Sequence, residues 1–359
     1  MPPPFNPPPV ATGRSPGSDR SQVPRGLATA VGSRPDRGSQ SRALARGSAP
    51  ARRPDTAEGA GRRPTAANRT GSLPASCGNS VPESKVGLVV VEGRLKGRVV
   101  ASGVLPAPAG SRVALVGDTH GNKAWTRRVI GALGAEGVDM VVQLGDFGWW
   151  PGKWFAKDVS RAAFIAGVSV CFLDGNHENH EQLRFHASLR DPDRGPADPV
   201  EMYPSLWYLP RGCAWEWRGV RFRALGGAYS IDHGTRTPGH DLFPAEEVPS
   251  PADAERAIAG GPADVLLCHD YPALGYILKG RPLPEADDRA SRQVQDMLAQ
   301  VAEAIQPKLV VHGHWHHAYT VELDGVSVVG LDCDGTDQAI ALLDLDTLQT
   351  TEWSLPGLP

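Results

Sequence analysis

The chain has 359 residues, of which 40 % are hydrophobic and 21 % are charged, and its formal net charge is −3. This composition is typical of a soluble protein, and no apolar run approaches the length that crosses a bilayer, which excludes a membrane-spanning class. The amino terminus lacks the apolar core of a signal peptide, and the five cysteines are scattered without a CxxC pair. These features predict free thiols in a reducing compartment, and hence a cytoplasmic protein.

Residues 1–85 differ from the rest of the chain in charge and composition. They carry thirteen Lys and Arg against five Asp and Glu, a net charge of +8 that leaves −11 on residues 86–359. They are rich in Pro, Gly and Ser without a periodic apolar pattern, so they cannot bury enough surface to offset chain entropy. We predict a disordered basic arm at 1–85 and one folded domain at 86–359.

The basic arm has two interpretations. Its positive charge is typical of a handle for nucleic acid or another polyanion. Base stacking, however, needs interleaved aromatic residues, and Phe5 is the only one in the arm. A solvated tail, or upstream sequence that is not translated if synthesis starts near Val86, is therefore favoured over a nucleic-acid contact.

The folded part begins with "GLVVVEG" and "GRVVASGVL", which predict a short pair of strands. One pattern then recurs five times: a compact Val- and Leu-rich run is followed at once by polar residues. The five runs are "RVALV", "DMVVQL", "VSVCFLD", "ADVLLC" and "PKLVV". Apolar runs of this length fit strands that are buried on both faces.

Helical segments separate these strands, namely "KAWTRRVIGALGAEG", "KDVSRAAFIAG" and "ADDRASRQVQDMLAQVAEAI". Strands that alternate with helices predict an α/β layered domain. In such domains ligands bind beyond the carboxyl ends of the strands, so we expect the five polar clusters to converge. The segments "RDPDRGPADPVEMYP" and "FRALGGAYSIDHGTRTPGHDLFPAEEVPS" lack periodicity and are predicted to be long surface loops.

The polar residues after the strands form a mixed set of oxygen and imidazole ligands. They are Asp118, His120, Asp146, Asn176, His269, His314 and His316. Carboxylate combined with imidazole suits manganese, iron, zinc or nickel, whereas an all-oxygen set would suit magnesium or calcium. Seven ligands exceed the needs of one ion and match two ions that share a bridging carboxylate, a recurring arrangement for displacement at phosphorus.

Each motif alone also has an ordinary structural explanation. Gly-Asp after a strand is common in turns, and a single Asp-x-His is weak evidence for a metal. The Asn176-His177 pair is more specific, because packing gives little reason for it at the end of a strand. His314 and His316 are stronger again, since residues i and i+2 of an extended chain point the same way. The five motifs together, each after an apolar run, are not explained by chance.

The set "GDTHG … GD … GNHE … H … GHWH" resembles the calcineurin-like metallophosphoesterases over roughly residues 112–332. The resemblance implies a four-layer α/β sandwich, in which two packed mixed β-sheets are flanked by helices. It also implies a phosphoesterase that hydrolyses phosphate mono- or diesters with a hydroxide bridging two divalent metal ions, of which manganese is favoured. The expected substrate is a small phosphate ester or a nucleotide, and no membrane partner is expected.

The resemblance also implies a role for each site residue. The first ion would be held by Asp118, His120 and His316. The second would be held by Asn176, His269 and His314, with Asp146 bridging the two. His177 would face the substrate and either give a proton to the leaving oxygen or brace the developing charge.

Four further residues near these motifs are not assigned as ligands. His312 is interpreted as a packing or supporting residue, and His317 is expected to be exposed because of its opposite parity. Asp270 and Asp332 are each interpreted either as carboxylates that orient an imidazole or as ordinary turn residues.

The sequence departs from well-known subfamilies directly after Asp146. The protein Ser/Thr phosphatases and the diadenosine tetraphosphate hydrolases usually have Asp-Arg-Gly there, whereas residues 147–152 contain no arginine. Trp149 and Trp150 form either an aromatic wall that stacks a planar substrate group, with Trp149 as the candidate, or a buried cap on the loop, which is favoured. Arg236 is a candidate phosphate clamp on its chemistry alone.

Two alternatives to a general phosphoesterase remain open at this point. A nuclease or cyclic nucleotide phosphodiesterase would use the same chemistry, and the basic arm and the two tryptophans favour it. The acidic balance of residues 86–359 disfavours long nucleic acids. A non-catalytic scaffold is the alternative from another class, but degenerate members normally lose ligands and all seven are present here.

Overall fold

The computed structural model describes residues 104–150, 154–238, 244–274 and 283–357. The predicted arm at 1–85 lies outside the described residues, as does nearly all of the strand pair expected before residue 106. Within the described ranges the strands form one seven-stranded and one six-stranded sheet.

The seven-stranded sheet has a parallel centre and antiparallel edges. Its order is β13-β12-β1-β2-β3-β5-β4, and β1, β2, β3 and β5 run parallel to one another. Its strands are β1 (Arg112–Val116), β2 (Met140–Leu144), β3 (Ser169–Leu173), β4 (Val200–Tyr203), β5 (Leu206–Tyr208), β12 (Ile340–Asp344) and β13 (Thr350–Glu352). Every residue of β2 is buried, which confirms that the apolar runs are covered on both faces.

The six-stranded sheet has the same design. Its order is β10-β11-β9-β8-β7-β6, with β7, β8, β9 and β11 parallel and the two edge strands antiparallel. Its strands are β6 (Ala214–Trp217), β7 (Val220–Leu225), β8 (Val265–Cys268), β9 (Leu309–His312), β10 (Tyr319–Leu323) and β11 (Val326–Gly330).

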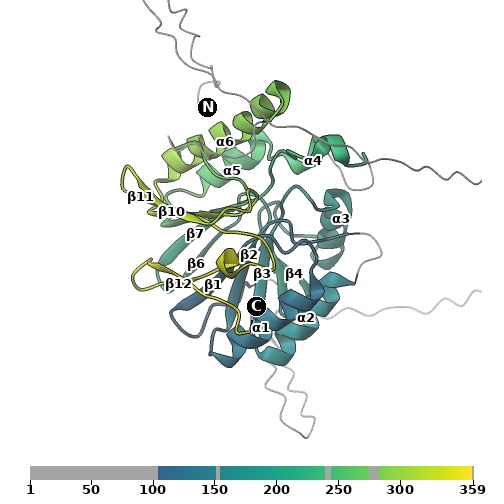
Figure 1. The fold of residues 1–359 in the computed structure, drawn as a ribbon, viewed down its shortest axis with the longest axis vertical. Helices are drawn as coiled ribbons and strands as arrows, with labels where there is room; N and C mark the ends of the chain where they lie inside the picture. The colour runs from purple at the N-terminus through teal and green to yellow at the C-terminus, as the bar shows by residue number, and fades with distance from the viewer. Residues whose placement is uncertain (1–103, 151–153, 239–243, 275–282, 358–359) are drawn as a thin grey trace, which may run out of the picture. The chain divides into compact units, whose positions relative to one another are not determined.

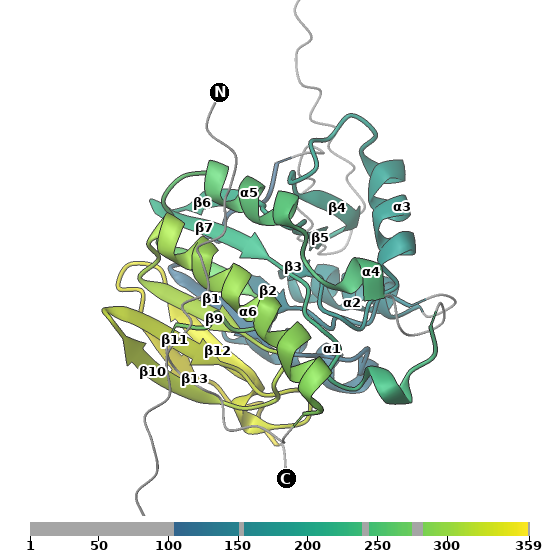
Figure 2. The same ribbon diagram turned by 90° about the horizontal axis from the view of Figure 1, so that it is seen from above.

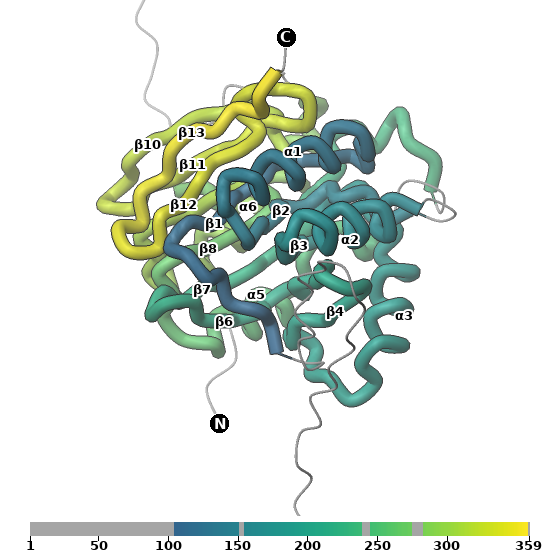
Figure 3. The backbone as a smooth tube through the Cα atoms, turned by 90° about the horizontal axis from the view of Figure 1, so that it is seen from below, coloured from purple at the N-terminus to yellow at the C-terminus, as the bar shows by residue number. Residues whose placement is uncertain are grey.

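Helices cover the outer face of each sheet. The helices are α1 (Lys123–Ala135), α2 (Phe155–Ala166), α3 (His180–Arg190), α4 (Pro244–Glu247), α5 (Pro251–Ala259) and α6 (Glu285–Ile305), with 3-10 turns η1 (His233–Thr235) and η2 (Asp337–Ala339). Figure 1 shows α5 and α6 on the outer face of the six-stranded sheet and α1 and α2 on the outer face of the seven-stranded sheet. Figures 2 and 3 show these two helical layers from above and from below. The four-layer sandwich expected from the sequence is confirmed.

The described helices and strands enclose three buried apolar clusters. One cluster lies between the two sheets and includes Leu115, Val142 and Phe222. The second packs α1 and α2 on the seven-stranded sheet, and the third packs α5 and α6 on the six-stranded sheet. Removing this apolar surface from water is the main stabilisation of a layered domain. No helix in the described ranges is both long enough and apolar enough to cross a membrane.

Two helices begin directly after loops that carry predicted ligands. The Asn122 side chain accepts a hydrogen bond from Trp125 N at the start of α1, two residues after His120. The Asn179 side chain accepts from Gln182 N at the start of α3, two residues after His177. Such caps satisfy backbone donors that a helix leaves open, so they fix where each loop ends.

The prediction of two long loops in the middle of the chain was partly wrong, because both segments contain secondary structure. The first contains β4, and the second contains the end of β7, η1 and α4. In β7 the charged residue Arg223 is only 2 % exposed, so the burial of this strand on both faces could not be inferred from its polar and apolar residues. Helix α3 was not expected either, because Leu183 and Ala187 are its only buried apolar side chains.

Candidate metal centre

The five polar clusters meet at one edge of the sandwich. Each follows the carboxyl end of a central strand: β1, β2 and β3 in one sheet, and β8 and β9 in the other. Parallel strands point their carboxyl ends to the same side, so residues spread over about 200 positions become neighbours. The structure therefore brings together all seven side chains that the sequence predicted as ligands.

One group consists of Asp118, His120 and His316. Their donor atoms all lie within 4.8 Å of one another. His316 Nε2 lies 3.0 Å from Asp118 Oδ2, and His120 Nε2 lies 4.0 Å from the same oxygen. One carboxylate oxygen and two imidazole nitrogens thus face a common point.

A second group consists of Asp146, His269 and His314, whose donor atoms also lie within 4.8 Å of one another. His269 Nε2 lies 3.3 Å from Asp146 Oδ1 and 3.0 Å from Asn176 Oδ1. The Asn176 amide oxygen therefore joins this group.

Asp146 connects the two groups. Its Oδ2 lies 3.6 Å from His120 Nε2, while its Oδ1 faces His269. The carboxylate is 1 % exposed, so both oxygens are held away from solvent. A carboxylate that presents one oxygen to each group has the geometry of a bridge.

Four of the predicted ligands adopt a left-handed backbone conformation. The φ angles are 42° at His120, 49° at Asp146, 66° at His314 and 46° at His316. This region is uncommon for residues with a side chain, and such strain concentrates at functional sites. The strained backbone turns side chains from several loops toward one point.

Glu178 holds two of the ligand loops together. Its carboxylate accepts hydrogen bonds from Gly148 N at 3.0 Å and from Gly175 N at 2.6 Å, so it joins the loops after β2 and β3. Burial, together with the nearby charge of Asp146, raises the pKa of Glu178 to about 8. The sequence singled out this residue as part of a motif but did not predict its bridging role.

The carboxylates of the site create a strong negative field in the protein without metal. Burial alone would lower the pKa of His120, but hydrogen bonds to Asp146 and Asp334 raise it to about 11. Burial likewise opposes the charged form of His269, yet Asp146 and Asp118 raise its pKa to about 10. The same carboxylates that favour protonated imidazoles would also favour a divalent metal ion, which would take the place of those protons.

The orientations of two histidines fit a metal ion. His269 Nδ1 lies 2.7 Å from the Leu144 carbonyl oxygen, which can only accept, so Nδ1 carries a proton and Nε2 is the nitrogen that would give up its proton to a metal ion. His314 Nε2 is buried and has no hydrogen-bond partner among the described residues. An orphaned buried nitrogen is costly unless a ligand occupies it. The donor set therefore fits divalent metal ions.

Support for His120 comes from a residue that the sequence did not predict. Asp334 Oδ1 lies 3.2 Å from His120 Nδ1, and Asp334 Oδ2 accepts from Asn122 Nδ2 at 2.6 Å. Asp332, considered for such a role, instead accepts from the backbone of Cys333. Asp270 accepts from Trp315 Nε1 at 2.7 Å and from Tyr271 N, so its hydrogen bonds do not go to an imidazole.

His177 lies at the same centre. Its Nε2 is 3.9 Å from Asp146 Oδ2 and 3.7 Å from Asp232 Oδ2, and its backbone N donates to Asp146 Oδ1 at 2.8 Å. The side chain is 26 % exposed, so it borders solvent, whereas Asp146 behind it is buried. Burial and the positive charge of Arg236 lower the pKa of His177, although Asp146 opposes the shift.

Arg236 lies beside the Asn176 loop. Its Nη2 donates to the Asn176 carbonyl oxygen at 3.3 Å, and its Nη1 donates to Ser230 Oγ. The side chain is only 5 % exposed. Its guanidinium is thus built into the wall of the site.

The two tryptophans after Asp146 occupy different environments. Trp149 is 7 % exposed and belongs to the core, stacked on Phe172 and Tyr203 with ring centroids 6.0 Å and 6.2 Å apart. The structure does not place Trp149 among the ligand side chains. Trp150 is the one that touches the site, because its Nε1 donates to the His177 carbonyl oxygen.

The remaining histidines of the 310–319 segment lie where expected. His312 is fully buried, with Nε2 2.6 Å from Tyr319 Oη, and it packs beneath the site. His317 is exposed. Both differ from His314 and His316, which point into the centre.

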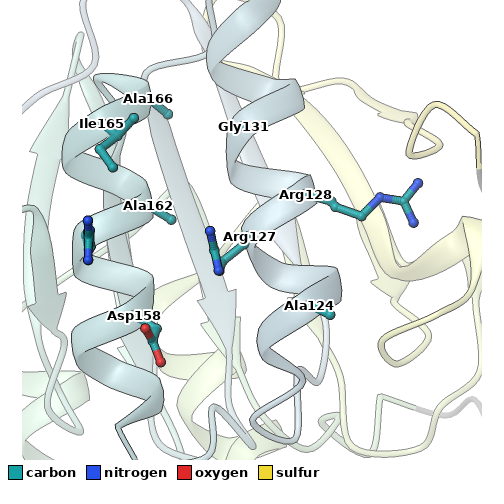
Figure 4. Close-up of a pocket in the computed structure, with 9 residues that line it drawn as sticks. Ala124, Arg127, Arg128, Gly131, Asp158, Ala162, Ile165 and Ala166 are labelled. Carbon is teal, nitrogen blue, oxygen red and sulfur yellow. The ribbon is translucent and has the colours of Figure 1, made fainter.

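A cavity of about 690 Å³ lies away from this centre, between α1 and α2 on the outer helical layer. In Figure 4 Arg127 points from α1 toward α2, whereas Arg128 points away and donates to the Pro356 and Gly357 carbonyl oxygens. Asp158 faces the cavity from α2. None of the predicted ligands lies among its described lining residues.

Comparisons with known proteins agree with the geometry. A family model described as calcineurin-like phosphoesterase matches residues 111–318. No curated protein sequence matches the chain. The chain is also similar, at low sequence identity, to several solved structures.

Three solved structures illustrate this low identity. The protein TT1561 from Thermus thermophilus is 17 % identical with a TM-score of 0.44, covering 69 % of this chain and 100 % of that one. A dimetal phosphatase from Danio rerio is 15 % identical with a TM-score of 0.38, over 69 % and 99 % of the two chains. A novel archaeal phosphodiesterase is 16 % identical with a TM-score of 0.36, over 68 % and 99 %.

Proposed function

Because the chain belongs to the calcineurin-like phosphoesterase family and is therefore a hydrolase of phosphoric esters, we propose that it hydrolyses phosphate mono- or diesters at a centre with two divalent metal ions. The observation that carries this proposal is the position of Asp146, whose two oxygens face separate groups of imidazoles. Two-metal centres with a shared carboxylate suit in-line displacement at phosphorus.

Each half of the centre would hold one ion. Asp118, His120 and His316 would bind the first, and Asn176, His269 and His314 the second, with Asp146 shared. When bound, the ions lower the pKa of a water molecule and neutralise charge on the phosphoryl oxygens. The mixture of carboxylate and imidazole donors favours manganese over magnesium or calcium.

His177 is proposed as the residue that acts on the leaving oxygen. Its ring borders both solvent and Asp146, so it can reach a substrate bound over the ligands. Asp232 Oδ2, 3.7 Å from His177 Nε2, opposes the fall in the pKa of His177 and so favours the imidazolium form that can donate a proton. The backbone hydrogen bond from His177 N to Asp146 fixes its distance from the centre.

Arg236 is proposed to contribute positive charge to the phosphate-binding side. Its Nη atoms donate to Ser230 and to the Asn176 backbone. It therefore acts by its position and its field, and not as an open bidentate clamp. A change of Arg236 to Lys keeps the charge but not these two directed hydrogen bonds.

The compartment is proposed to be the reducing cytoplasm. Cys171, Cys213 and Cys268 are buried free thiols in the structure. Burial raises the pKa of the Cys213 thiol to about 12, so it stays protonated and unreactive.

The function is tested by turnover of two chromogenic esters, bis-p-nitrophenyl phosphate and p-nitrophenyl phosphate. The full chain is stripped with a chelator and resupplied with manganese, and Asp146→Asn runs in parallel. We expect activity to return with metal and to fall about a hundredfold or more in the variant, because a neutral amide cannot supply the bridging charge.

The two esters separate the kinds of activity. Cleavage of the diester assigns a diesterase, and cleavage of the monoester alone assigns a phosphatase. Metal-independent turnover, or full activity in a folded Asp146→Asn variant, would contradict the proposal. The circular dichroism spectrum of the variant shows whether it is folded.

A further inference from the structure

A cavity of about 210 Å³ lies between the loop after β2, the start of α2 and one face of α3. Four aromatic side chains and two basic or imidazole groups surround it: Trp149, Trp150, Trp154, Tyr203, Lys157 and His186. Aromatic density of this kind is unusual around a solvent-accessible hollow, because most large aromatic side chains are used to fill cores.

The cavity shares a wall with the metal centre. Trp150 lines the cavity, and its Nε1 donates to the carbonyl oxygen of His177. Its six-membered ring packs on Gly121, where an added Cβ would lie 2.8 Å from Trp150 Cζ3. Gly121 follows the predicted ligand His120, so a single indole separates the cavity from both sides of the centre.

The cavity has a rigid floor and an exposed rim. Trp149 is buried in the core and stacks on the partly buried Tyr203, and His186 packs edge-on against Trp149 with ring centroids 5.7 Å apart. Trp154 is 66 % exposed, and Lys157 Nζ lies 4.1 Å from its ring centroid. An exposed indole that contributes little to the core can stack on a ligand, and the Lys157 side chain, which covers one face of the indole, can move aside to bind carbonyl oxygens of that ligand.

We propose that this cavity is a subsite for a planar heterocyclic ring, such as a nucleobase, that is attached to the phosphate ester. The proposal rests on the proposed phosphoesterase function, because the adjacent centre would cleave the ester. Stacking on tryptophan tolerates any base, since every base has a π-face. The chemistry therefore predicts a preference for nucleoside esters over alkyl esters, with little choice among bases.

The test compares two esters with the same reporter. Thymidine 5′-(p-nitrophenyl phosphate) and methyl p-nitrophenyl phosphate both release p-nitrophenolate when water adds to phosphorus and the P–O bond breaks. They differ only in the nucleoside. We expect the wild type to show a higher kcat/KM for the nucleoside ester by about tenfold, as one stacked base contributes.

Trp154→Ala is expected to bring the ratio of the two kcat/KM values close to one. Because Trp154 is mostly exposed, its removal leaves the core intact, which thermal unfolding verifies. Phe164→Ala is the matched control, since Phe164 is an exposed aromatic residue (41 %) on the adjoining helix but outside the cavity. It should keep the wild-type ratio. Lys157→Ala should lower the ratio in the same direction as Trp154→Ala.

Each outcome is informative. A ratio near one in the wild type, or an unchanged ratio in folded Trp154→Ala, overturns the subsite while turnover of the methyl ester keeps the phosphoesterase function. Absence of turnover with both esters counts against the diesterase function. In that case equilibrium dialysis with free thymidine tests the subsite alone. Weaker binding by Trp154→Ala than by wild type supports it, and equal binding or none overturns it.

Discussion

The side-chain amide of Asn176 donates a hydrogen bond to Ser230 Oγ at 3.0 Å. Ser230 Oγ in turn donates to Glu247 Oε2 at 2.9 Å, and all three side chains are at most 1 % exposed. With Nδ2 committed to Ser230, Asn176 Oδ1 must face the opposite way, toward His269 Nε2. Ser230 and Glu247 thus orient the Asn176 side-chain oxygen that we propose as a metal ligand.

Replacing Ser230 with Ala should weaken the binding of one of the two proposed metal ions. Without its acceptor the Asn176 amide can rotate, and loss of such a supporting hydrogen bond typically costs about 10–100-fold in metal affinity. Isothermal titration with manganese should show one weakened and one unchanged site. The matched control is Ser188→Ala, whose hydroxyl bonds only the backbone of α3. Two unchanged affinities in Ser230→Ala would refute the positioning role.

Replacing His177 with Ala should lower the rate of hydrolysis most for esters with poor leaving groups. p-Nitrophenolate leaves readily without a proton, whereas an alkoxide needs one in the transition state. The kcat of His177→Ala should therefore fall about tenfold further on methyl or phenyl esters than on p-nitrophenyl esters. Initial rates on the two classes give the ratio directly. An equal loss on both would point to electrostatic bracing, because that function does not depend on leaving-group basicity.

Metal addition should raise the thermal stability of the protein. Ions bind the folded centre, where Asp118, Asp146 and Glu178 are buried together, and they bind the unfolded chain weakly. Manganese at a hundred times its Kd should add about 2.7 kcal/mol. Differential scanning fluorimetry with and without chelator measures the shift. Magnesium at the same concentration is the control and should shift Tm less, because imidazole donors disfavour it.

Much of the fold and the candidate residues of the centre could be predicted, because the sequence patterns that indicate them lie within short segments of the chain. Each of the five strands is a short apolar run, and each predicted ligand stands within a few residues of a strand end, so the order of residues along the chain was sufficient to select the candidates. Asn176 and His314 could therefore be found without any knowledge of their contacts.

The supporting residues could not be predicted, because their roles depend on contacts between distant segments. Ser230 meets Asn176 across 54 positions, and Asp334 meets His120 across 214. The direction in which the Trp149 side chain points could not be predicted from the sequence either. Backbone φ angles of 49° at Asp146 and 103° at Gly148 turn the loop so that Trp149 faces the core and Trp150 faces the site.

Acid should weaken a contact far from the centre. Hydrogen bonds from Arg221, and a further one from Lys308, hold the pKa of Asp264 well below its usual range. A depressed pKa stabilises the fold fully above the unfolded-state value, about 3.9, and this stability is lost progressively as the pH falls from that value toward the folded-state pKa. Asp264→Asn should therefore lower the urea midpoint at pH 7 and should lower it by less at pH 3.

The matched control for Asp264 is Asp346→Asn. Asp346 pairs with Arg218 at 3.2 Å but is 59 % exposed, so solvent screens it and little change is expected at either pH. A deficit in Asp264→Asn that is the same at pH 3 and pH 7 would show that the contact acts through packing and not through charge.

A single methyl group at Gly175 should remove activity without unfolding the protein. A Cβ there would overlap Asp146 Oδ1 and the Asp146 backbone nitrogen, and it would lie 2.7 Å from His269 Nε2. The backbone cannot yield easily, because Gly175 N is bonded to Glu178. Gly175→Ala should therefore displace the shared carboxylate and lower kcat about a hundredfold, with loss of manganese binding in titration.

Gly131→Ala is the control for this substitution. Gly131 lies within α1, and an added Cβ would have no atom within 4 Å apart from its chain neighbours and the backbone of its own helix, so alanine there should leave activity unchanged and add about 0.5–1 kcal/mol of stability. If Gly175→Ala keeps wild-type kcat and both manganese sites, the position of Asp146 between the two groups is not what the reaction requires.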